Sequence, residues 1–423
     1  GDEVAAMQWF LQACAQGEAR AWLTLHRSSG KELGFDLETI KRDVWRNRVS
    51  MEQIRVAHEW LKRLVDAGNT WGQFLQGCLL LKGIDGVQES DEAEGIALVT
   101  RAAEGGLAAA QNALGLLHAK GEQGVAQNLE EATRLYRLSA EQGNSSAQNN
   151  LGSCYAAGNG VGQNFEEAVK WFHLAAEGGH GPAQYNLGLC YFHGNGVKVN
   201  KTEAVAYFKR SADLGDADAQ YNLAWCYRYG HGVGKDNAQA VRLYRAAADQ
   251  GNVYALYNLG MCYAKGRVVD ENKREALSLF KRAAKLNDAD SMYMIGLYYS
   301  IGEAGVRRDI STARVFWEHA ARLEHAGAKE ALKLVENMSM GRASSGRPQL
   351  FPDIILPASA STSPSSSNNS SPAPRRRQAG VNGRWRQSDN APEREVDGDD
   401  EVGQDSGLSR FASLPLFSSD LFE

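Results

Sequence analysis

Apolar and small residues recur between residues 56 and 333 at spacings that fit one face of an α-helix. In residues 183–191 an alanine, a leucine and a tyrosine stand four positions apart, which is the spacing of a buried helical stripe. A second block at residues 203–213 carries two adjacent aromatic residues and several alanines. The turn Gly194-Asn195-Gly196-Val197 lies between the blocks, and glycine allows the positive φ angles of tight turns. The pattern therefore predicts two helices joined by a short turn.

This two-helix pattern repeats with a period of 36 residues. A Leu-small-x-Cys-Tyr motif marks the first helix of four successive units, at residues 151–155, 187–191, 223–227 and 259–263. The small residue occurs in seven units, and a glycine follows it six residues later each time, at the pairs 77 and 83, 115 and 121, 152 and 158, 188 and 194, 224 and 230, 260 and 266, and 296 and 302. Tandem units of this length stack on one another. We therefore expect an all-α, right-handed α-solenoid of antiparallel helix hairpins, with about seven units over residues 56–338.

The start of each second helix carries a capping signal. An Asn or Asp stands four residues before an alanine at this point in six units, at Asn128, Asn164, Asn200, Asp236, Asn272 and Asp309. In the first five of these units a Glu or Gln follows three residues later, which is the spacing of a capping box. Each such cap stabilises a helix by about 1 kcal/mol. These residues are therefore expected to fix where the second helices begin.

The two ends of the chain depart from the regular repeat. A tryptophan and three small residues at positions 9–21 fit the repeat spacing, so we expect residues 1–55 to hold a degenerate repeat unit and an insert, in a chain that begins inside a repeat. Eight of the nine prolines lie at or after Pro348, where serine, glycine and charged residues are also frequent. Such a composition cannot bury enough apolar surface to offset the entropy of ordering. It predicts a disordered, low-complexity tail over residues 339–423.

The tail carries three blocks of distinct chemistry. Residues 372–386 contain five arginines and no acid, whereas residues 389–405 contain eight acids and one arginine. We interpret these blocks as a solvated spacer, with self-association or a charged partner as the alternative. Apolar side chains return near the end, at Phe411, Leu416, Phe417 and Phe422. This terminal block is expected to fold onto a partner or to dock back onto the chain's own solenoid.

The repeat resembles the Sel-1-like repeat family, a relative of the tetratricopeptide repeats. The resemblance rests on the Leu-Gly pairs of the first helices, the Gly-Asn-Gly-Val type of turn, the aromatic residues of the second helices and the Ala-Ala-x-x-Gly at their ends. Ala224 and Asn287 replace glycines of this pattern, but alanine is also small and Asn tolerates positive φ. The resemblance implies a solenoid scaffold that binds proteins, as in adaptors for endoplasmic-reticulum-associated degradation or in signalling assemblies.

The first helices are expected to present a binding stripe. If the core leucine sets 0°, the residue two positions before it falls at about 160°, the residue two after it at about 200° and the residue one before it at about 260°. These positions predict an outward row of Tyr185, Tyr221, Trp225, Tyr257, Met261 and Tyr293, flanked by Asn186, Asn222 and Asn258. The resemblance implies that this face lines the concave surface. The alternative is that curvature packs the tyrosines against one another while the Asn side chains bind local carbonyl groups.

Composition and charge bear on three further predictions: nucleic-acid binding, membrane insertion and cellular compartment. The chain has 46 basic and 51 acidic residues, so its net charge of −5 offers no whole-chain attraction for nucleic acid. It contains no run of eighteen apolar residues, so we expect no membrane span. Four of the six cysteines share one first-helix position and should lie about 9–10 Å apart, too far for a disulfide. Free, buried thiols predict a cytoplasmic protein, with the endoplasmic-reticulum lumen as the alternative if a leader precedes the chain.

Candidate chemistry for catalysis is missing from the sequence. The six cysteines and nine histidines form no motif with metal-ligand spacing, and no catalytic or cofactor-binding constellation stands out. We therefore predict a non-enzymatic scaffold or adaptor that binds protein or peptide segments without a cofactor. Two alternatives stay open. The chain could be an adaptor subunit of a ubiquitin-ligase complex in endoplasmic-reticulum-associated degradation, or the regulatory region of a larger enzyme, such as a kinase, whose catalytic domain lies upstream.

Overall fold

The computed structural model describes residues 61–82, 90–266 and 268–339, which hold helices and no β-strand. The helices are α5 (Thr70–Lys82), α6 (Glu92–Glu104), α7 (Ala108–Lys120), α8 (Leu129–Glu141), α9 (Ser145–Ala157), α10 (Phe165–Glu177), α11 (Gly181–His193), α12 (Lys201–Asp213), α13 (Ala217–Tyr229), α14 (Asn237–Asp249), α15 (Val253–Lys265), α16 (Lys273–Lys285), α17 (Ala289–Ile301), α18 (Ile310–Arg322) and α19 (Ala326–Ser339). Odd-numbered helices are the first helices of the repeat and even-numbered helices are the second helices.

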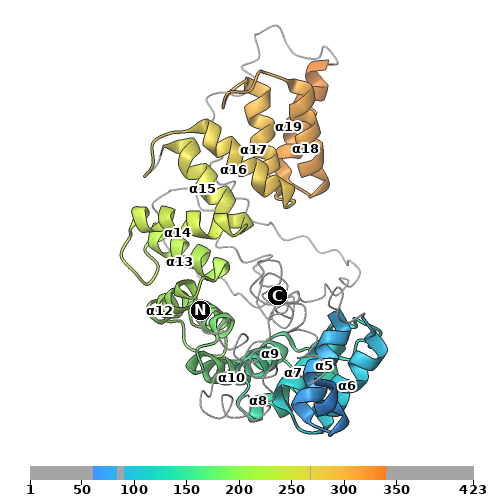
Figure 1. Ribbon diagram of the computed structural model, residues 1–423. Coiled ribbons are helices and arrows are strands. Elements are labelled where there is room, and N and C mark those ends of the chain that lie inside the picture. Colours follow the sequence, from blue (N-terminus) through green and yellow to red (C-terminus); the bar gives the residue numbers. More distant parts are fainter. Residues whose placement is uncertain (1–60, 83–89, 267, 340–423) are drawn as a thin grey trace, which may run out of the picture.

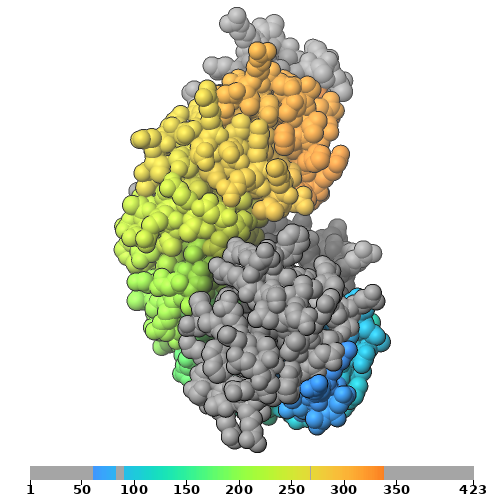
Figure 2. Space-filling view, in the orientation of Figure 1, coloured from blue at the N-terminus to red at the C-terminus, as the bar shows by residue number. Residues whose placement is uncertain are grey.

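The helices form a curved row of stacked hairpins that runs from α5 and α6 at one end to α19 at the other (Figure 1). Each first helix packs most extensively on the second helix of its own hairpin, and each second helix also contacts the first helix of the next hairpin. In the green, yellow and orange part of the row, side chains fill the space between neighbouring hairpins (Figure 2). The predicted all-α solenoid of antiparallel hairpins is confirmed. The two predicted terminal regions, residues 1–55 and 339–423, lie almost wholly outside the described residues.

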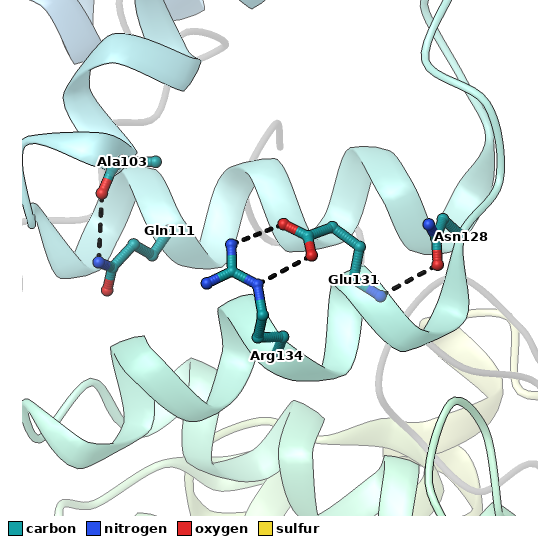
Figure 3. A network of polar contacts seen from close by, with 5 residues as sticks. All are labelled: Ala103, Gln111, Asn128, Glu131 and Arg134. Carbon is teal, nitrogen blue, oxygen red and sulfur yellow. Dashed lines mark hydrogen bonds and ion pairs between the residues drawn. The ribbon is translucent and has the colours of Figure 1, made fainter.

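The predicted caps begin the second helices, but only half of the expected capping box forms. At α8 the Asn128 Oδ1 atom accepts a hydrogen bond from the Glu131 backbone N–H at 3.0 Å (Figure 3). The Asn128 N–H donates instead to the His118 carbonyl of the first helix at 2.8 Å. The Glu131 carboxylate pairs with Arg134 at 2.7 Å, and this contact lowers the pKa of Glu131. The cap thus also ties the second helix to the end of the first helix.

Glycines shape the turn between the two helices of a hairpin. Gly194 ends α11 with a φ of +80°, and its N–H donates to the Cys190 carbonyl at 2.8 Å. Gly196 has a φ of +68°, and a Cβ atom there would lie 2.3 Å from the Phe165 carbonyl oxygen at the start of α10. Only a glycine therefore lets this turn lie against the previous hairpin. In the turn between α15 and α16 the same position is Val268, whose φ is +73°.

In the hairpins from α7–α8 to α17–α18, the core contains an aromatic ring packed on a small residue. A Cβ atom on Gly188 of α11 would lie 2.7 Å from the Phe208 ring of α12, and Gly152 has the same relationship to Phe172. The rings that occupy this position are fully buried, at Tyr136, Phe172, Phe208, Tyr244, Phe280 and Trp317. Asn287 adopts a φ of +63°, as expected for the residue that replaces glycine after α16. No helix within the described residues is long and apolar enough to cross a membrane.

Candidate protein-binding surface

Asparagine side chains join successive first helices to one another. The Asn150 Nδ2 atom of α9 donates to the Asn112 Oδ1 atom of α7 at 3.1 Å. The Asn186 Nδ2 atom of α11 donates to the Asn149 Oδ1 atom of α9 at 2.9 Å. The Asn222 Nδ2 atom of α13 donates to the Tyr185 hydroxyl at 3.2 Å. These asparagines therefore set the stacking of hairpins, in place of the outward role that the helical projection predicted.

The predicted outward tyrosines are mostly packed inside the solenoid. Tyr185 is 2% exposed and Tyr221 is 3% exposed. The Tyr221 ring lies 5.8 Å from the Tyr244 ring of α14 and 5.6 Å from the Tyr254 ring of α15. Tyr257 and Met261 are also buried. The expectation that these side chains point outward was wrong, and the alternative of tyrosines packed on one another describes them.

The error has a simple physical cause. The projection placed each first helix on a single core and left its opposite side to solvent. In the solenoid, α13 packs between α12 and α14, and its side chains also bond to both neighbouring first helices. On the far side, Asp218 of α13 accepts a hydrogen bond from Asn252, which caps α15, at 2.8 Å. Most of the circumference of a first helix is therefore covered by other repeats.

The remaining predicted site residues are half-buried or lie outside the described residues. Asn258 donates to the Tyr254 carbonyl of its own helix at 2.9 Å, and Tyr293 stacks on His325 with ring centroids 4.7 Å apart. Trp225 is half-buried and belongs to the cluster described next. Phe411, Leu416, Phe417 and Phe422 lie outside the described residues.

Four half-buried aromatic rings meet where α11 and α13 end. Trp225 of α13 stacks on His231 in the following turn, with centroids 4.5 Å apart. Tyr229 lies 5.2 Å from Trp225, and Phe192 of α11 lies 5.7 Å from it. We call Phe192, Trp225, Tyr229 and His231 the aromatic rim. Aromatic residues that are grouped and partly exposed are typical of protein contact surfaces.

A cation lies beside the aromatic rim. The Lys201 Nζ atom, at the start of α12, lies 5.3 Å from the centre of the Phe192 ring and 3.5 Å from His231 Nδ1. Lys201 forms no ion pair with any described residue. The rim thus offers apolar area next to an unneutralised positive charge.

The sequence prediction found Trp225 but missed the other three rim residues. Phe192, Tyr229 and His231 occupy positions where the other repeats carry different residue types; position 192, for example, corresponds to Ala156 in the preceding repeat. A search for large side chains at positions that vary between repeats would have found them. Most positions that the projection selected, such as those of Tyr221 and Asn222, carry the same residue type in several repeats, and they contribute to the stacking that these repeats share.

Comparison with known proteins agrees with this fold. The family model described as Sel1 repeat matches residues 1–18, 72–107, 108–144, 145–180, 181–216, 217–252, 253–288 and 289–325. The crystal structure of a protective antigen from uropathogenic Escherichia coli strains, which displays an SLR fold, is 28% identical, with a TM-score of 0.58 over 75% of this chain and 67% of that chain. A Sel1 repeat protein from Oxalobacter formigenes is 29% identical, with a TM-score of 0.53 over 63% of this chain and 99% of that chain. No curated protein matches the sequence.

Proposed function

Because the chain belongs to the Sel1 repeat family, whose members are generally protein-interaction scaffolds, we propose that it is a non-enzymatic scaffold that binds a protein segment at the aromatic rim. The bound segment carries apolar or aromatic side chains next to carboxylates. The observation that carries this proposal is the stack of Trp225 on His231 beside the Lys201 ammonium group.

The chemistry of the rim selects this kind of segment. Aromatic side chains contribute large contact areas and have few torsions to restrict on binding, so they often supply most of the binding energy of an interface. Lys201 is exposed and favours a carboxylate near the bound apolar groups. A charge at the edge of a contact mainly speeds association and selects the partner's orientation. Binding is therefore expected to weaken as salt concentration rises.

The chain itself contains a segment with this chemistry. Residues 408–423 combine seven large apolar residues, among them Phe411, Leu416, Phe417 and Phe422, with two acids, Asp420 and Glu423. We infer that this block competes with other segments for the aromatic rim. Alanine at Phe411, Leu416, Phe417 and Phe422 should then increase capture of a partner by the full chain. Reduced capture would show that the block recruits the partner itself.

The identity of the captured partner distinguishes between two cellular roles for the chain. A role as an adaptor in endoplasmic-reticulum-associated degradation predicts capture of ubiquitin-ligase subunits. A role as the regulatory region of an enzyme predicts capture or covalent attachment of a catalytic domain, such as a kinase. The two roles also predict different compartments, since the first requires the endoplasmic-reticulum lumen and the second fits the predicted cytoplasmic location.

Affinity purification of the full chain with quantitative mass spectrometry tests the binding site. The variant carries Phe192→Ala and Trp225→Ala, and the control carries Phe316→Ala, which removes a half-buried ring stacked on Tyr299 far from the rim. We expect the double variant to lose captured proteins that the wild type and the control retain. Equal capture by all three chains, with unchanged helical circular dichroism, would show that the rim is not the binding site.

A further inference from the structure

A cation and a tyrosine lie side by side at two successive junctions between a second helix and the next first helix. The Arg245 Nη2 atom of α14 donates to the Tyr263 hydroxyl of α15 at 2.7 Å. The Lys281 Nζ atom of α16 donates to the Tyr299 hydroxyl of α17 at 3.4 Å and lies 5.5 Å from the centre of its ring. The four helices follow one another in the row of hairpins (Figure 1). Their junctions therefore place two cation–phenol pairs on neighbouring hairpins.

A change in the repeat leaves the charges on α14 unneutralised. In α8 the Glu131 carboxylate pairs with Arg134 at 2.7 Å (Figure 3). Three repeats later the same two positions hold Gln239 and Arg242, and the uncharged amide of Gln239 cannot neutralise an arginine. Arg242 stands one turn before Arg245 on α14. This helix therefore carries two positive charges next to each other without a capping-box carboxylate.

The surrounding helices are also basic. Helices α14–α17 carry eight basic and three acidic residues, whereas α8–α11 carry three basic and six acidic residues. Lys285 stands four residues after Lys281 on α16, at a position where α14 carries Asp249. We define the basic edge as the following residues: Arg242, Arg245, Tyr263, Lys281, Lys285 and Tyr299. None of its four cations forms an ion pair with another described residue.

Each cation–phenol pair can hold a carboxylate. The Tyr263 oxygen accepts a hydrogen bond from Arg245, so its own O–H is left to donate, and the guanidinium group has further N–H donors. Neither the Tyr263 nor the Tyr299 hydroxyl donates to another described residue. A carboxylate at such a pair would receive a charge-assisted hydrogen bond. Equivalent positions of adjacent hairpins lie about 10 Å apart, so a ligand of the basic edge needs several carboxylates along an extended length.

One segment of the chain has carboxylates in such an arrangement. Residues 389–405 contain eight acids and one arginine. Five of these acids occupy every second position, at Glu393, Glu395, Asp397, Asp399 and Glu401. Alternate side chains of an extended segment point to the same side, so the five carboxylates would form one row of about 26 Å. This row is long enough to contact both cation–phenol pairs.

We propose that residues 393–401 bind in extended form to the basic edge of the same chain, with their carboxylates on the Arg245–Tyr263 and Lys281–Tyr299 pairs. Fifty-three residues separate Ser339, the last residue of α19, from this segment. A chain of that length with random-coil dimensions spans about 40 Å, and the covalent link gives the segment a high local concentration. Acidic segments of other proteins must then displace it before they can bind the basic edge.

Carboxylate-to-amine crosslinking of the full chain tests the docking. A zero-length reagent couples lysines to acids that are in contact, and mass spectrometry identifies the coupled peptides. Lys333 of α19 is the internal reference, because it is exposed and lies closer in sequence to the acidic segment. We expect Lys281 and Lys285 to couple to residues 393–401 several-fold more than Lys333 does, at a yield that does not change on dilution.

Three outcomes of this experiment would overturn the proposal. The first is equal or stronger coupling of Lys333. The second is coupling between two copies, which a mixture of isotopically labelled and unlabelled chains reveals. The third is no coupling at Lys281 or Lys285, the result expected if the arginines of residues 372–386 hold the acidic segment instead.

Matched variants separate docking from the stacking of hairpins. Arg242→Gln with Arg245→Gln removes two charges from the basic edge. Arg134→Gln with Arg137→Gln removes the equivalent pair from α8, where Arg137 donates to the Tyr155 hydroxyl at 2.8 Å. Both variants lose the same kind of contact between hairpins. We expect coupling of the α16 lysines to fall several-fold in the first variant and to stay at the wild-type level in the second. Equal coupling in the two variants would contradict the proposal.

A permuted segment tests the extended row of carboxylates. The changes Glu395→Val, Val396→Glu, Asp397→Gly and Gly398→Asp keep the composition and the net charge but interrupt the alternation. We expect this chain to couple less than the wild type, and the wild-type coupling to weaken as salt concentration rises. Undiminished coupling by the permuted chain would show that the segment does not bind as an extended row. The basic edge shares no residue with the aromatic rim, so this proposal can fail while the proposed function stands.

Discussion

The side-chain amide of Asn186 donates a hydrogen bond to the Asn149 Oδ1 atom at 2.9 Å across two consecutive first helices. Both residues are 1% exposed, so this contact is made away from water. A buried polar group that loses its partner destabilises the fold more than an average hydrogen bond stabilises it. The pair therefore fixes how one hairpin stacks on the next.

Removing this amide should lower the stability of the solenoid. Asn186→Ala is expected to reduce the free energy of unfolding by about 1–3 kcal/mol, because the Asn149 oxygen loses a buried donor. The matched control is Asn258→Ala, since Asn258 occupies the equivalent position but bonds to the Tyr254 carbonyl of its own helix. Urea unfolding followed by circular dichroism checks both. Equal losses in the two variants would show that the contact between repeats adds nothing.

The turn glycines should differ sharply in their tolerance of alanine. Gly196→Ala is expected to cost about 1–3 kcal/mol, because the residue has a positive φ and a Cβ would overlap the Phe165 carbonyl. Gly234, which lies in the next turn, has an ordinary φ, and a Cβ atom added to it would meet no other atom within 4 Å. Gly234→Ala should therefore be close to neutral in thermal melts. A neutral Gly196→Ala would contradict the close approach of this turn to α10.

At Val268, in contrast, a substitution by glycine is expected to increase the stability of the fold. Its φ of +73° is unfavourable for a β-branched residue, and its side chain is 50% exposed. Val268→Gly should stabilise the chain by about 1 kcal/mol, since it relieves the backbone without removing a core contact. Val199→Gly is the control, because Val199 is 59% exposed and has an ordinary φ. A fall in melting temperature for Val268→Gly would refute the backbone argument.

The cap at Asp309 predicts a dependence of stability on pH. Hydrogen bonds from the Ser311 and Thr312 hydroxyls lower the pKa of Asp309 to about 2. A lowered pKa in the folded state stabilises the fold above the unfolded pKa, near 3.9, and this contribution is lost as pH falls toward 2. Asp309→Asn should therefore differ most from wild type near neutral pH and least near pH 2. A stability difference that stays constant from pH 7 to pH 2 would contradict a role for the ionised cap.

The fold could be predicted from the sequence because each repeat carries the same local signals. Asn128, Gly194 and the aromatic-on-glycine pair of Gly188 and Phe208 are signals that act within one hairpin. The exposed surface could not be predicted in the same way, since exposure depends on how hairpins curve against one another. Tyr185 and Asn186 repeat regularly along the chain, but that regularity reflects stacking between repeats.

Only one residue of the candidate site could be predicted from the sequence. The helical projection selected Trp225 because it stands two positions after the core leucine of its helix. Its neighbours Phe192 and His231 come from another hairpin and from a turn, so no helical projection could bring the three together.

The most direct test of partner binding at the aromatic rim places a photo-reactive group there. Phe192 is replaced by p-benzoylphenylalanine in the full chain, the cells that express it are irradiated, and the crosslinked peptides are identified by mass spectrometry. The same replacement of Phe316 serves as the control. We expect crosslinks from position 192, and not from position 316, to a segment with apolar and acidic side chains. Crosslinks of equal yield from both positions, or none from position 192, would contradict binding at the rim.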